Sequence, residues 1–196
     1  PVVNSRIIGE INRGALIVTY SGHGSSQLWD GIGTIFDNAD VRDELENVGK
    51  LPVVVSLSCV NGWFVDKPGP ANYCLAEQLL LSADKGAVAA FTASGNSLPR
   101  KHAILATGFF KSLYAQGESV LGVAALLGKL YLSERIELEQ EAIEVLRTFV
   151  LFGDPALVLR KPGLPEKEAV QNPAVFAEPG GVNSLALAQF NIADAL

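Results

Sequence analysis

Three short runs of almost uninterrupted apolar residues constrain the fold of this chain more than any other feature of its sequence. They cover residues 15–20, 52–57 and 86–92. Strands that are apolar on both faces are typical of a parallel sheet covered by helices on both sides. The segments between the runs carry turn residues and helix-like spacing, which predicts an α/β fold with a mostly parallel sheet.

The rest of the chain supplies the predicted helices and a closing strand. One helix is predicted from a cap at Asp37, Asn38 or Asp40 to about Val48, because Val41, Leu45 and Val48 recur on one face. Others are predicted over 72–83, 102–115, 119–132 and 134–149. A short strand is expected over 156–160, after a turn at 152–155. From about residue 162, frequent proline and glycine predict a linker or the start of a following domain, which gives the divisions 1–161 and 162–196.

Composition excludes several classes of protein. With 196 residues, 48% of them hydrophobic, the chain suits one domain that buries roughly 70% of its unfolded surface. The net charge is −6 and lysine and arginine form no block, so nucleic-acid binding is not expected. The sequence contains no apolar run of the length that spans a membrane. Two cysteines, Cys59 and Cys74, allow one disulfide at most and are equally compatible with two free thiols.

Two of the apolar runs end in residues suited to acyl transfer. His23 follows the first run, in a loop of small polar residues over 21–26, and Cys59 follows the second. Reactive groups collect outside the carboxyl ends of parallel strands, so we expect the imidazole and the thiol to lie close together. A thiol is a strong nucleophile, and an imidazole accepts its proton. The backbone N–H groups of Gly24 and Cys59 are the candidates for an oxyanion hole.

Plainer interpretations of these residues stay open. A cysteine after an apolar strand is often a small buried hydrophobe, and both strand-end residues can be inert packing. A zinc site built from Cys59, Cys74, His23 and His102 is not expected, because no pair has the close spacing of zinc ligands. His102 is interpreted as a surface or helix-cap residue. The acidic residues over 37–46 lack a calcium-loop pattern and are interpreted as a solvated helix face, so no cofactor is required and structural calcium has no support.

Several segments together resemble a known family. In chain order they are Tyr-Ser-Gly-His-Gly-Ser at 20–25, Trp29, Ser-Cys-Val-Asn-Gly-Trp-Phe at 58–64, Cys-Leu-Ala-Glu at 74–77 and Phe-Gly-Asp-Pro-Ala-Leu at 152–157. Over about 14–160 the chain resembles the gingipain family of cysteine peptidases, which has a caspase-like fold, a three-layer sandwich around a mostly parallel sheet. The resemblance implies that Cys59 is the nucleophile, His23 the catalytic histidine and Gly24 part of the oxyanion hole. It also implies that Cys74 is structural, and that the pocket for the side chain before the scissile bond is lined by Ser21, Gly22 and Leu57.

The chain departs from the family's basic-specific members in two places. Those members carry an acidic pocket residue well upstream of the histidine, whereas 22 residues precede His23 here. They also have an aromatic wall past the third core strand, where this sequence has Pro99 or a neighbour and no aromatic residue. Cleavage after arginine or lysine is therefore not implied. The first strands of a caspase-like sheet are expected upstream of Pro1, in a segment that is removed or carried as another chain.

The function expected from the resemblance is that of a cysteine endopeptidase that hydrolyses peptide bonds through a Cys59–His23 dyad and an acyl-enzyme. Its expected partners are a peptide or protein substrate and, in addition, its own N-terminal segment or a second chain. An extracellular or cell-surface location follows from the family alone. The alternative is a caspase-like self-processing or non-catalytic binding module of a larger bacterial protein. A related caspase-like domain found beside helical repeats in bacterial signalling proteins fits less well, because this chain has no repeats.

Overall fold

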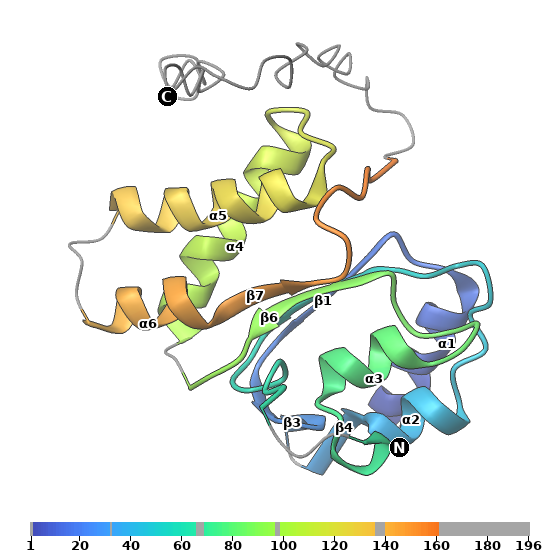
Figure 1. The fold of residues 1–196 in the computed structure, drawn as a ribbon. Helices are drawn as coiled ribbons and strands as arrows, with labels where there is room; N and C mark the ends of the chain where they lie inside the picture. Colours follow the sequence, from blue (N-terminus) through green and yellow to red (C-terminus); the bar gives the residue numbers. More distant parts are fainter. Residues whose placement is uncertain (1, 32, 66–68, 97–98, 136–139, 161–196) are drawn as a thin grey trace, which may run out of the picture.

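A central four-stranded sheet organises the computed structural model, which describes residues 2–31, 33–65, 69–96, 99–135 and 140–160. The strand order is β1-β5-β6-β7 (Figure 1). Strands β1 (Ile17–Ser21), β5 (Val53–Leu57) and β6 (Ala89–Ala93) run parallel, and β7 (Phe149–Phe152) is antiparallel to β6. The three apolar runs thus form the three parallel strands, as predicted.

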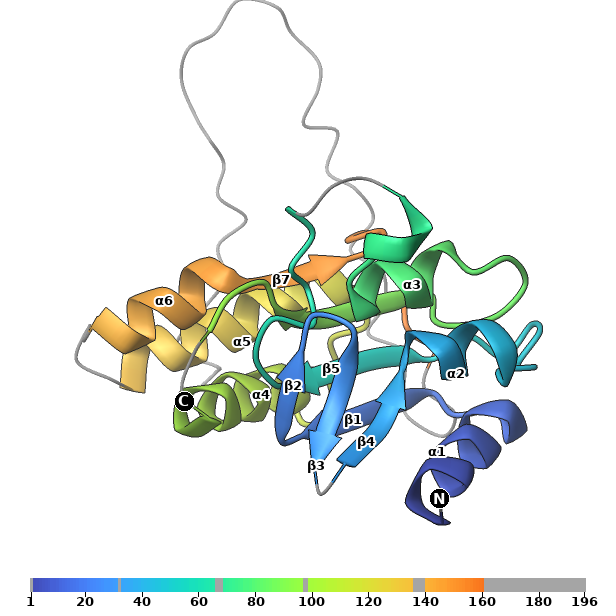
Figure 2. The ribbon, with the colours of Figure 1, turned by 90° about the horizontal axis from the view of Figure 1, so that it is seen from below.

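Helices cover both faces of this sheet, as Figures 1 and 2 show. One layer consists of α4 (Pro99–Tyr114), α5 (Leu121–Arg135) and α6 (Gln140–Thr148), and the other of α1 (Val2–Arg13), α2 (Asn38–Asp43) and α3 (Leu75–Leu81), with a short 3-10 helix η1 (Pro70–Asn72) before α3. Alternate residues of β5 serve the two layers, because Val53 and Val55 join the core under α4 and α5 while Val54 joins the core with α3. This two-sided burial explains why the strands are apolar throughout.

A second, antiparallel sheet follows β1 directly. Its order is β2-β3-β4, with β2 (His23–Ser25), β3 (Leu28–Gly31) and β4 (Gly33–Asp37), and Figure 2 shows the three strands side by side. The prediction of a plain loop over 21–26 was wrong. Buried Trp29 and Phe36 give this small sheet an apolar face, and pairing with β3 makes an extended strand of residues that have little strand propensity of their own.

The helix predicted to reach Val48 ends earlier. Helix α2 stops at Asp43, and Val48 is 64% exposed, although Val41 and Leu45 are buried as expected. The side chain of Asn12 in α1 donates to the carbonyl oxygen of Glu44 (3.0 Å) and accepts from the amide of Glu46 (2.7 Å). These bonds take up backbone groups just beyond the helix, which a one-dimensional pattern does not reveal.

The closing strand lies before the predicted turn rather than after it. Strand β7 takes Phe149, the last residue of the helix predicted over 134–149, and reaches Phe152, the first residue of the predicted turn, while 156–160 contribute an isolated bridge between Val120 and Val158. The turn itself is confirmed, with Gly153 at a φ of 113° and the Asp154 side chain accepting from the amide of Ala156 at 2.8 Å. Pairing with the edge of β6 selects the strand.

The remaining helices are confirmed with shifted ends, as α3, α4, α5 and α6. Helix α1 has no counterpart among the predicted elements, although Ile8 and Ile11 form its buried stripe.

The predicted linker or domain start over 162–196 lies outside the described residues. Within the described residues, no helix combines the length and apolar character needed to cross a bilayer.

Candidate active site

The two predicted reactive residues leave the main sheet at the same edge. Strands β1 and β5 are parallel neighbours, and their register places Ser21 opposite Leu57. His23 and Cys59 each lie two residues beyond these paired positions. The predicted neighbourhood of the two strand ends is therefore confirmed at the level of the sheet.

Beyond the strands, the segments that carry His23 and Cys59 pack directly against each other. A Cβ atom added to Gly24 would lie 2.8 Å from the Ser58 Oγ, closer than real Cβ atoms come to other atoms, and 3.1 Å from the Asn61 Nδ2, which is also tight. Glycine is therefore needed here for close approach of the backbone. Gly24 follows His23, and Ser58 precedes Cys59, so the contact joins the immediate neighbours of both residues. His23 is exposed and Cys59 is half-buried, so both belong to the surface of this junction.

A buried amide ties the two segments together. Asn61, which is 1% exposed, donates from Nδ2 to the carbonyl oxygens of Ser25 (2.6 Å) and Leu28 (3.0 Å), the residues that close the β2–β3 hairpin. Its Oδ1 accepts from the hydroxyl of Ser56 at 2.7 Å and from that of Ser58. The amide thus binds the hairpin that carries His23 on one side and the segment that leads to Cys59 on the other.

Two aromatic residues extend this network. The buried indole of Trp29 donates to the Ser56 Oγ at 3.0 Å and stacks on Tyr20, with the ring centroids 4.6 Å apart. The Tyr20 hydroxyl lies 2.6 Å from the carbonyl oxygen of His23 and 2.8 Å from that of Asp30, and it donates to this pair. Burial raises the pKa of Tyr20, which keeps the hydroxyl protonated as a donor. The backbone of His23 is therefore held from the side of β1.

The turn that follows Cys59 holds a strained residue. Val60 has a φ of 51°, which is rare for a β-branched side chain. Its amide donates to the carbonyl oxygen of Gly95 (3.3 Å), and the amide of Gly62 donates to that of Ala93 (2.9 Å), so the end of β6 fixes the turn. Such strain costs about 1–3 kcal/mol and persists only where the surroundings impose it.

The predicted pocket residues divide between surface and core. Ser21 and Gly22 are exposed, and a side chain at Gly22 would collide with the ring of Tyr20, whose Cζ would lie 2.8 Å from the added Cβ. Leu57 is buried in the core under α4 and α5. Their role in a substrate pocket stays a prediction.

A cavity of about 380 Å³ lies elsewhere, and none of the predicted site residues lines it. Its lining is Gln27, Leu28, Asp37, Asn38, Ala39, Arg42, Pro70 and Ala71.

The second cysteine is placed as an interior residue. Cys74 is fully buried and forms the N-cap of α3, where its amide donates to the Glu77 carboxylate at 2.9 Å. Burial raises the pKa of the Cys74 thiol to about 12. No disulfide joins Cys59 and Cys74.

The interpretation of His102 as a surface or cap residue was wrong. His102 is 1% exposed, packs edge-on against Phe149 at 5.1 Å between ring centroids, and hydrogen-bonds the backbone of Leu57. Helix α4 begins at Pro99, so His102 lies inside its first turn and not at its cap, and His102 is one of the buried residues of the helix. Burial lowers the pKa of its imidazole, and the bond to Leu57 opposes this in part.

The described residues offer no ligand cluster for a metal, since they contain no group of three or more His, Cys, Asp or Glu side chains placed to hold one. Asp37 and Asp40, considered for calcium, form the capping box of α2 instead. The Asp37 carboxylate accepts from the amides of Ala39 (2.7 Å) and Asp40 (3.1 Å), and the Asp40 carboxylate accepts from the amide of Asp37 (2.8 Å). Capping explains these acidic residues.

Sequence reasoning did not identify the residues that connect the two segments, namely Tyr20, Trp29, Ser56 and Asn61. One signal was present. Ser56 is the only polar residue within the apolar run at 52–57, and a hydroxyl in a strand buried on both faces needs a hydrogen-bond partner. Its partner, Asn61, stands in the motif that carries the family resemblance.

Comparison with known proteins gives concordant results. The sequence profile of peptidase family C25 matches residues 1–160. Gingipain R1 of Porphyromonas gingivalis is 26% identical over 181 residues, which cover 88% of this chain and 17% of that protein. Gingipain R2 of the same organism is also 26% identical, with 88% of this chain and 23% of that protein covered. The chain thus spans less than a quarter of the length of these relatives.

Solved structures agree with the fold. The crystal structure of the Arg-specific cysteine proteinase gingipain R matches with a TM-score of 0.67 and 24% identity, over 81% of this chain and 36% of that one. The complex of the RgpB pro- and mature domains from Porphyromonas gingivalis matches with a TM-score of 0.72 and 25% identity, over 81% and 37% of the two chains. These matches confirm the caspase-like α/β fold. Because the family profile covers residues 1–160 of 196, the chain belongs to peptidase family C25, the gingipain-like cysteine peptidases.

Proposed function

We propose that this chain carries the catalytic centre of a cysteine endopeptidase, with Cys59 as nucleophile and His23 as proton carrier. The observation that supports it most is the packing of Gly24 against Ser58, which joins the neighbours of the two reactive residues at the carboxyl edge of the main sheet. Family membership supports the expected chemistry, and the close packing at the junction supports this location for it.

The proposed reaction has two steps. His23 takes the proton of the Cys59 thiol, and the sulfur attacks the carbonyl carbon of a peptide bond. An S–C bond forms, the C–N bond breaks, and the imidazolium of His23 gives its proton to the leaving amine. Water then attacks the acyl carbon while His23 takes one of its protons; the S–C bond breaks, the acid leaves, and His23 returns the proton to the sulfur. The backbone N–H groups of Gly24 and Cys59 donate to the oxyanion that develops in both steps.

Specificity in this proposal rests on Ser21, Gly22 and Leu57. Two small exposed residues and a buried leucine on the neighbouring strand offer no charge to a basic side chain. We therefore propose a preference for uncharged residues before the scissile bond. The Arg specificity named for the neighbouring gingipain structure is not transferred to this chain.

A library of fluorogenic peptides, varied at the residue before the cleaved bond, tests the proposal. The protein is compared with Cys59→Ala and His23→Ala, and Cys74→Ala is the matched control because it removes the other thiol. We expect turnover by the unaltered protein and by Cys74→Ala, and a loss of about 10⁴-fold or more in the first two variants. Equal turnover by Cys59→Ala and the unaltered protein would refute the assignment.

A second candidate is self-processing of a longer chain. One solved relative is a complex of pro- and mature domains, which favours a partner segment of this kind. We propose that an N-terminal segment or a second chain occupies the same surface, and that the protein acts outside the cell or on its surface. If a longer natural chain that contains these residues is processed equally with and without Cys59→Ala, self-cleavage is excluded.

A further inference from the structure

We infer that Asn61 is a positioning residue that sets the place of His23 relative to Cys59. The inference rests on the proposed Cys59–His23 dyad and goes beyond it, because it assigns the alignment of the dyad to one buried amide. The junction of the two segments is the feature that the inference explains.

The Asn61 amide uses its full hydrogen-bonding capacity at the junction. A carboxamide has two N–H donors and two acceptor positions on its oxygen. The two donors meet the carbonyl oxygens of Ser25 and Leu28, and the oxygen accepts from Ser56 and Ser58. A rotation of the amide by 180° would set its oxygen against two carbonyl oxygens. All four hydrogen bonds are therefore made in one amide orientation and with the hairpin in one position.

The backbone at this junction repeats the same connection. The amide of Ala76 donates to the carbonyl oxygen of Asn61 (3.0 Å), and the amide of Leu75 donates to that of Ser26 (2.7 Å). The first turn of α3 therefore binds the Cys59 segment and the hairpin with consecutive N–H groups. Side-chain and backbone bonds thus hold the hairpin from both the Cys59 segment and the start of α3.

The position of His23 depends on where these bonds hold the β2–β3 hairpin. His23 lies in the three-residue strand β2, is exposed, and belongs to a small sheet separate from the main one. The main sheet therefore does not hold the imidazole directly. Misplacement of a catalytic group by 1 Å costs about 100-fold in rate, so a shift of the hairpin is sufficient to uncouple the dyad.

A second buried asparagine supplies a matched control. Asn47 is 0% exposed; its Nδ2 donates to the carbonyl oxygens of Gly86 (2.8 Å) and Lys50 (3.1 Å), and its Oδ1 accepts from the amide of Gly86 (2.9 Å). Lys50 precedes β5 and Gly86 precedes β6, so Asn47 lies at the opposite end of the main sheet. The two asparagines share residue type, burial and the use of both amide groups, and differ in where they lie.

The experiment measures the rate of Cys59 alkylation by iodoacetamide as a function of pH, together with thermal unfolding and peptide turnover. The proteins are the unaltered chain, His23→Ala, Asn61→Ala and Asn47→Ala. We expect Asn61→Ala and Asn47→Ala to lower the melting temperature to a similar extent. Only Asn61→Ala is expected to move the pH profile of alkylation toward that of His23→Ala and to lower kcat about 100-fold, with KM changed by about twofold or less.

The outcomes separate the two hypotheses. If His23→Ala leaves the alkylation profile of the unaltered protein unchanged, the proposed dyad fails. If His23→Ala changes that profile while Asn61→Ala matches Asn47→Ala and the unaltered protein, the dyad stands and the positioning role is overturned. Should Asn61→Ala not fold, Ser58→Ala decides in the same way, because it removes one donor to the Asn61 oxygen and leaves the amide in place.

Discussion

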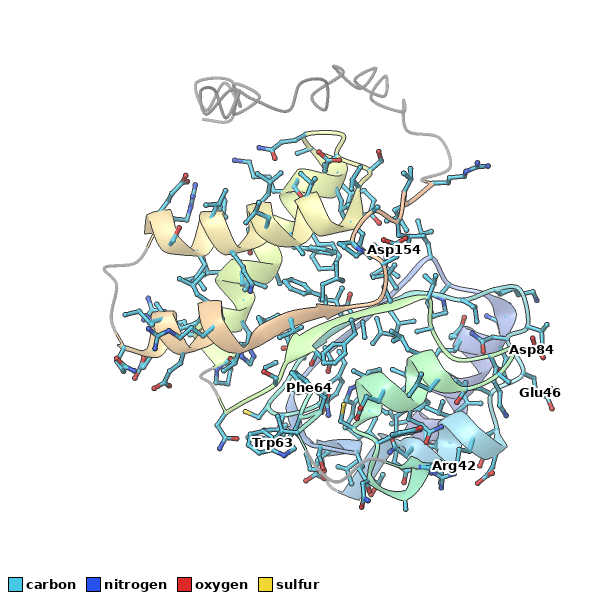
Figure 3. The ribbon with its side chains drawn as sticks, viewed as in Figure 1. Arg42, Glu46, Trp63, Phe64, Asp84 and Asp154 are labelled. Atoms are coloured by element: carbon cyan, nitrogen blue, oxygen red, sulfur yellow. The ribbon has the colours of Figure 1, made fainter. Side chains whose placement is uncertain are left out.

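The two ends of the main sheet use the same kind of interaction for different purposes. At the amino end, buried Asn47 joins two backbone segments, and exposed Asp84 and Glu46 mark that end in Figure 3. At the carboxyl end, buried Asn61 joins the His23 hairpin to the Cys59 segment, close to the strained Val60, and Trp63 and Phe64 mark that side. A buried amide at the amino end joins loops, whereas the buried amide at the carboxyl end also orients the segments that carry His23 and Cys59. Asn61 has this additional role because it lies at the carboxyl end of the parallel strands, and not because its hydrogen bonds differ in kind.

The largest expected difference concerns the two thiols. At pH 8 a thiol with a pKa of about 12, as burial gives Cys74, is ionised to about 10⁻⁴. We expect iodoacetamide to label half-buried Cys59 at least about 10³-fold faster than Cys74 in the folded protein. Peptide mapping of the labelled protein measures both rates. Equal, slow labelling of both residues would favour inert packing at the carboxyl end.

The next prediction concerns the close approach of the hairpin. Gly24→Ala places a Cβ against Ser58 and Asn61, so we expect the hairpin to shift, with a loss of about 100-fold in kcat and a lower melting temperature. Gly9→Ala in α1 is the control, since a Cβ there meets nothing within 4 Å. Alanine favours a helix over glycine, so this control raises stability by about 0.5–1 kcal/mol. Unchanged turnover in Gly24→Ala would show that the contact does not matter for chemistry.

A smaller effect is expected from the buried imidazole of His102. The folded protein lowers the pKa of His102, whereas the unfolded chain protonates it near its usual value of about 6.5. The unfolded state then binds more protons in this window, so the free energy of unfolding rises with pH and falls on acidification below about 6.5. Urea unfolding between pH 8 and pH 5 measures the slope.

His102→Phe keeps a ring against Phe149 and removes the titration, so we expect a flatter slope. The same slope in His102→Phe and the unaltered protein would contradict the assignment.

The smallest effect on stability is expected at Val60 and Asp84, the two non-glycine residues of positive φ in the described part of the chain. Val60 (φ 51°) and Asp84 (φ 61°) lie at the carboxyl and amino ends, and aspartate tolerates this conformation far better than valine. In Val60→Gly, relief of strain offsets lost burial, so we expect unfolding free energy to change by about 1 kcal/mol or less. A freer turn lowers kcat in Val60→Gly, whereas Asp84→Gly keeps it. Urea unfolding and peptide turnover are measured for both variants. Equal kcat values would contradict the expectation that only the Val60 turn affects catalysis.

The main sheet, and the edge at which His23 and Cys59 follow its strands, could be predicted from the sequence because both depend on local composition. Continuous apolar runs predict β1, β5 and β6, and parallel pairing brings Ser21 opposite Leu57 without further information. The second sheet is different, since the residues over 23–25 become a strand only through pairing with β3. Strand β7 likewise continues directly from α6, and the switch after Thr148 depends on the free edge of β6.

The candidate site divides in the same way. The resemblance gives the identities of His23 and Cys59, whereas the network around Asn61 depends on partners up to 36 positions apart. The prediction for His102 was wrong for the same reason, because its hydrogen bond reaches Leu57 on another element. Long-range hydrogen bonds have no periodic signature, so a single sequence does not reveal them.

The indole bond of Trp29 provides the protein with an internal optical sensor. The chain has two tryptophans, and Trp29 is 2% exposed while Trp63 is 39% exposed. Replacement of Trp63 by phenylalanine leaves Trp29 as the single tryptophan, whose N–H donates to the Ser56 hydroxyl. Its emission then follows the seating of the hairpin in real time, and an inhibitor or a bound chain that shifts the hairpin becomes visible without any added dye.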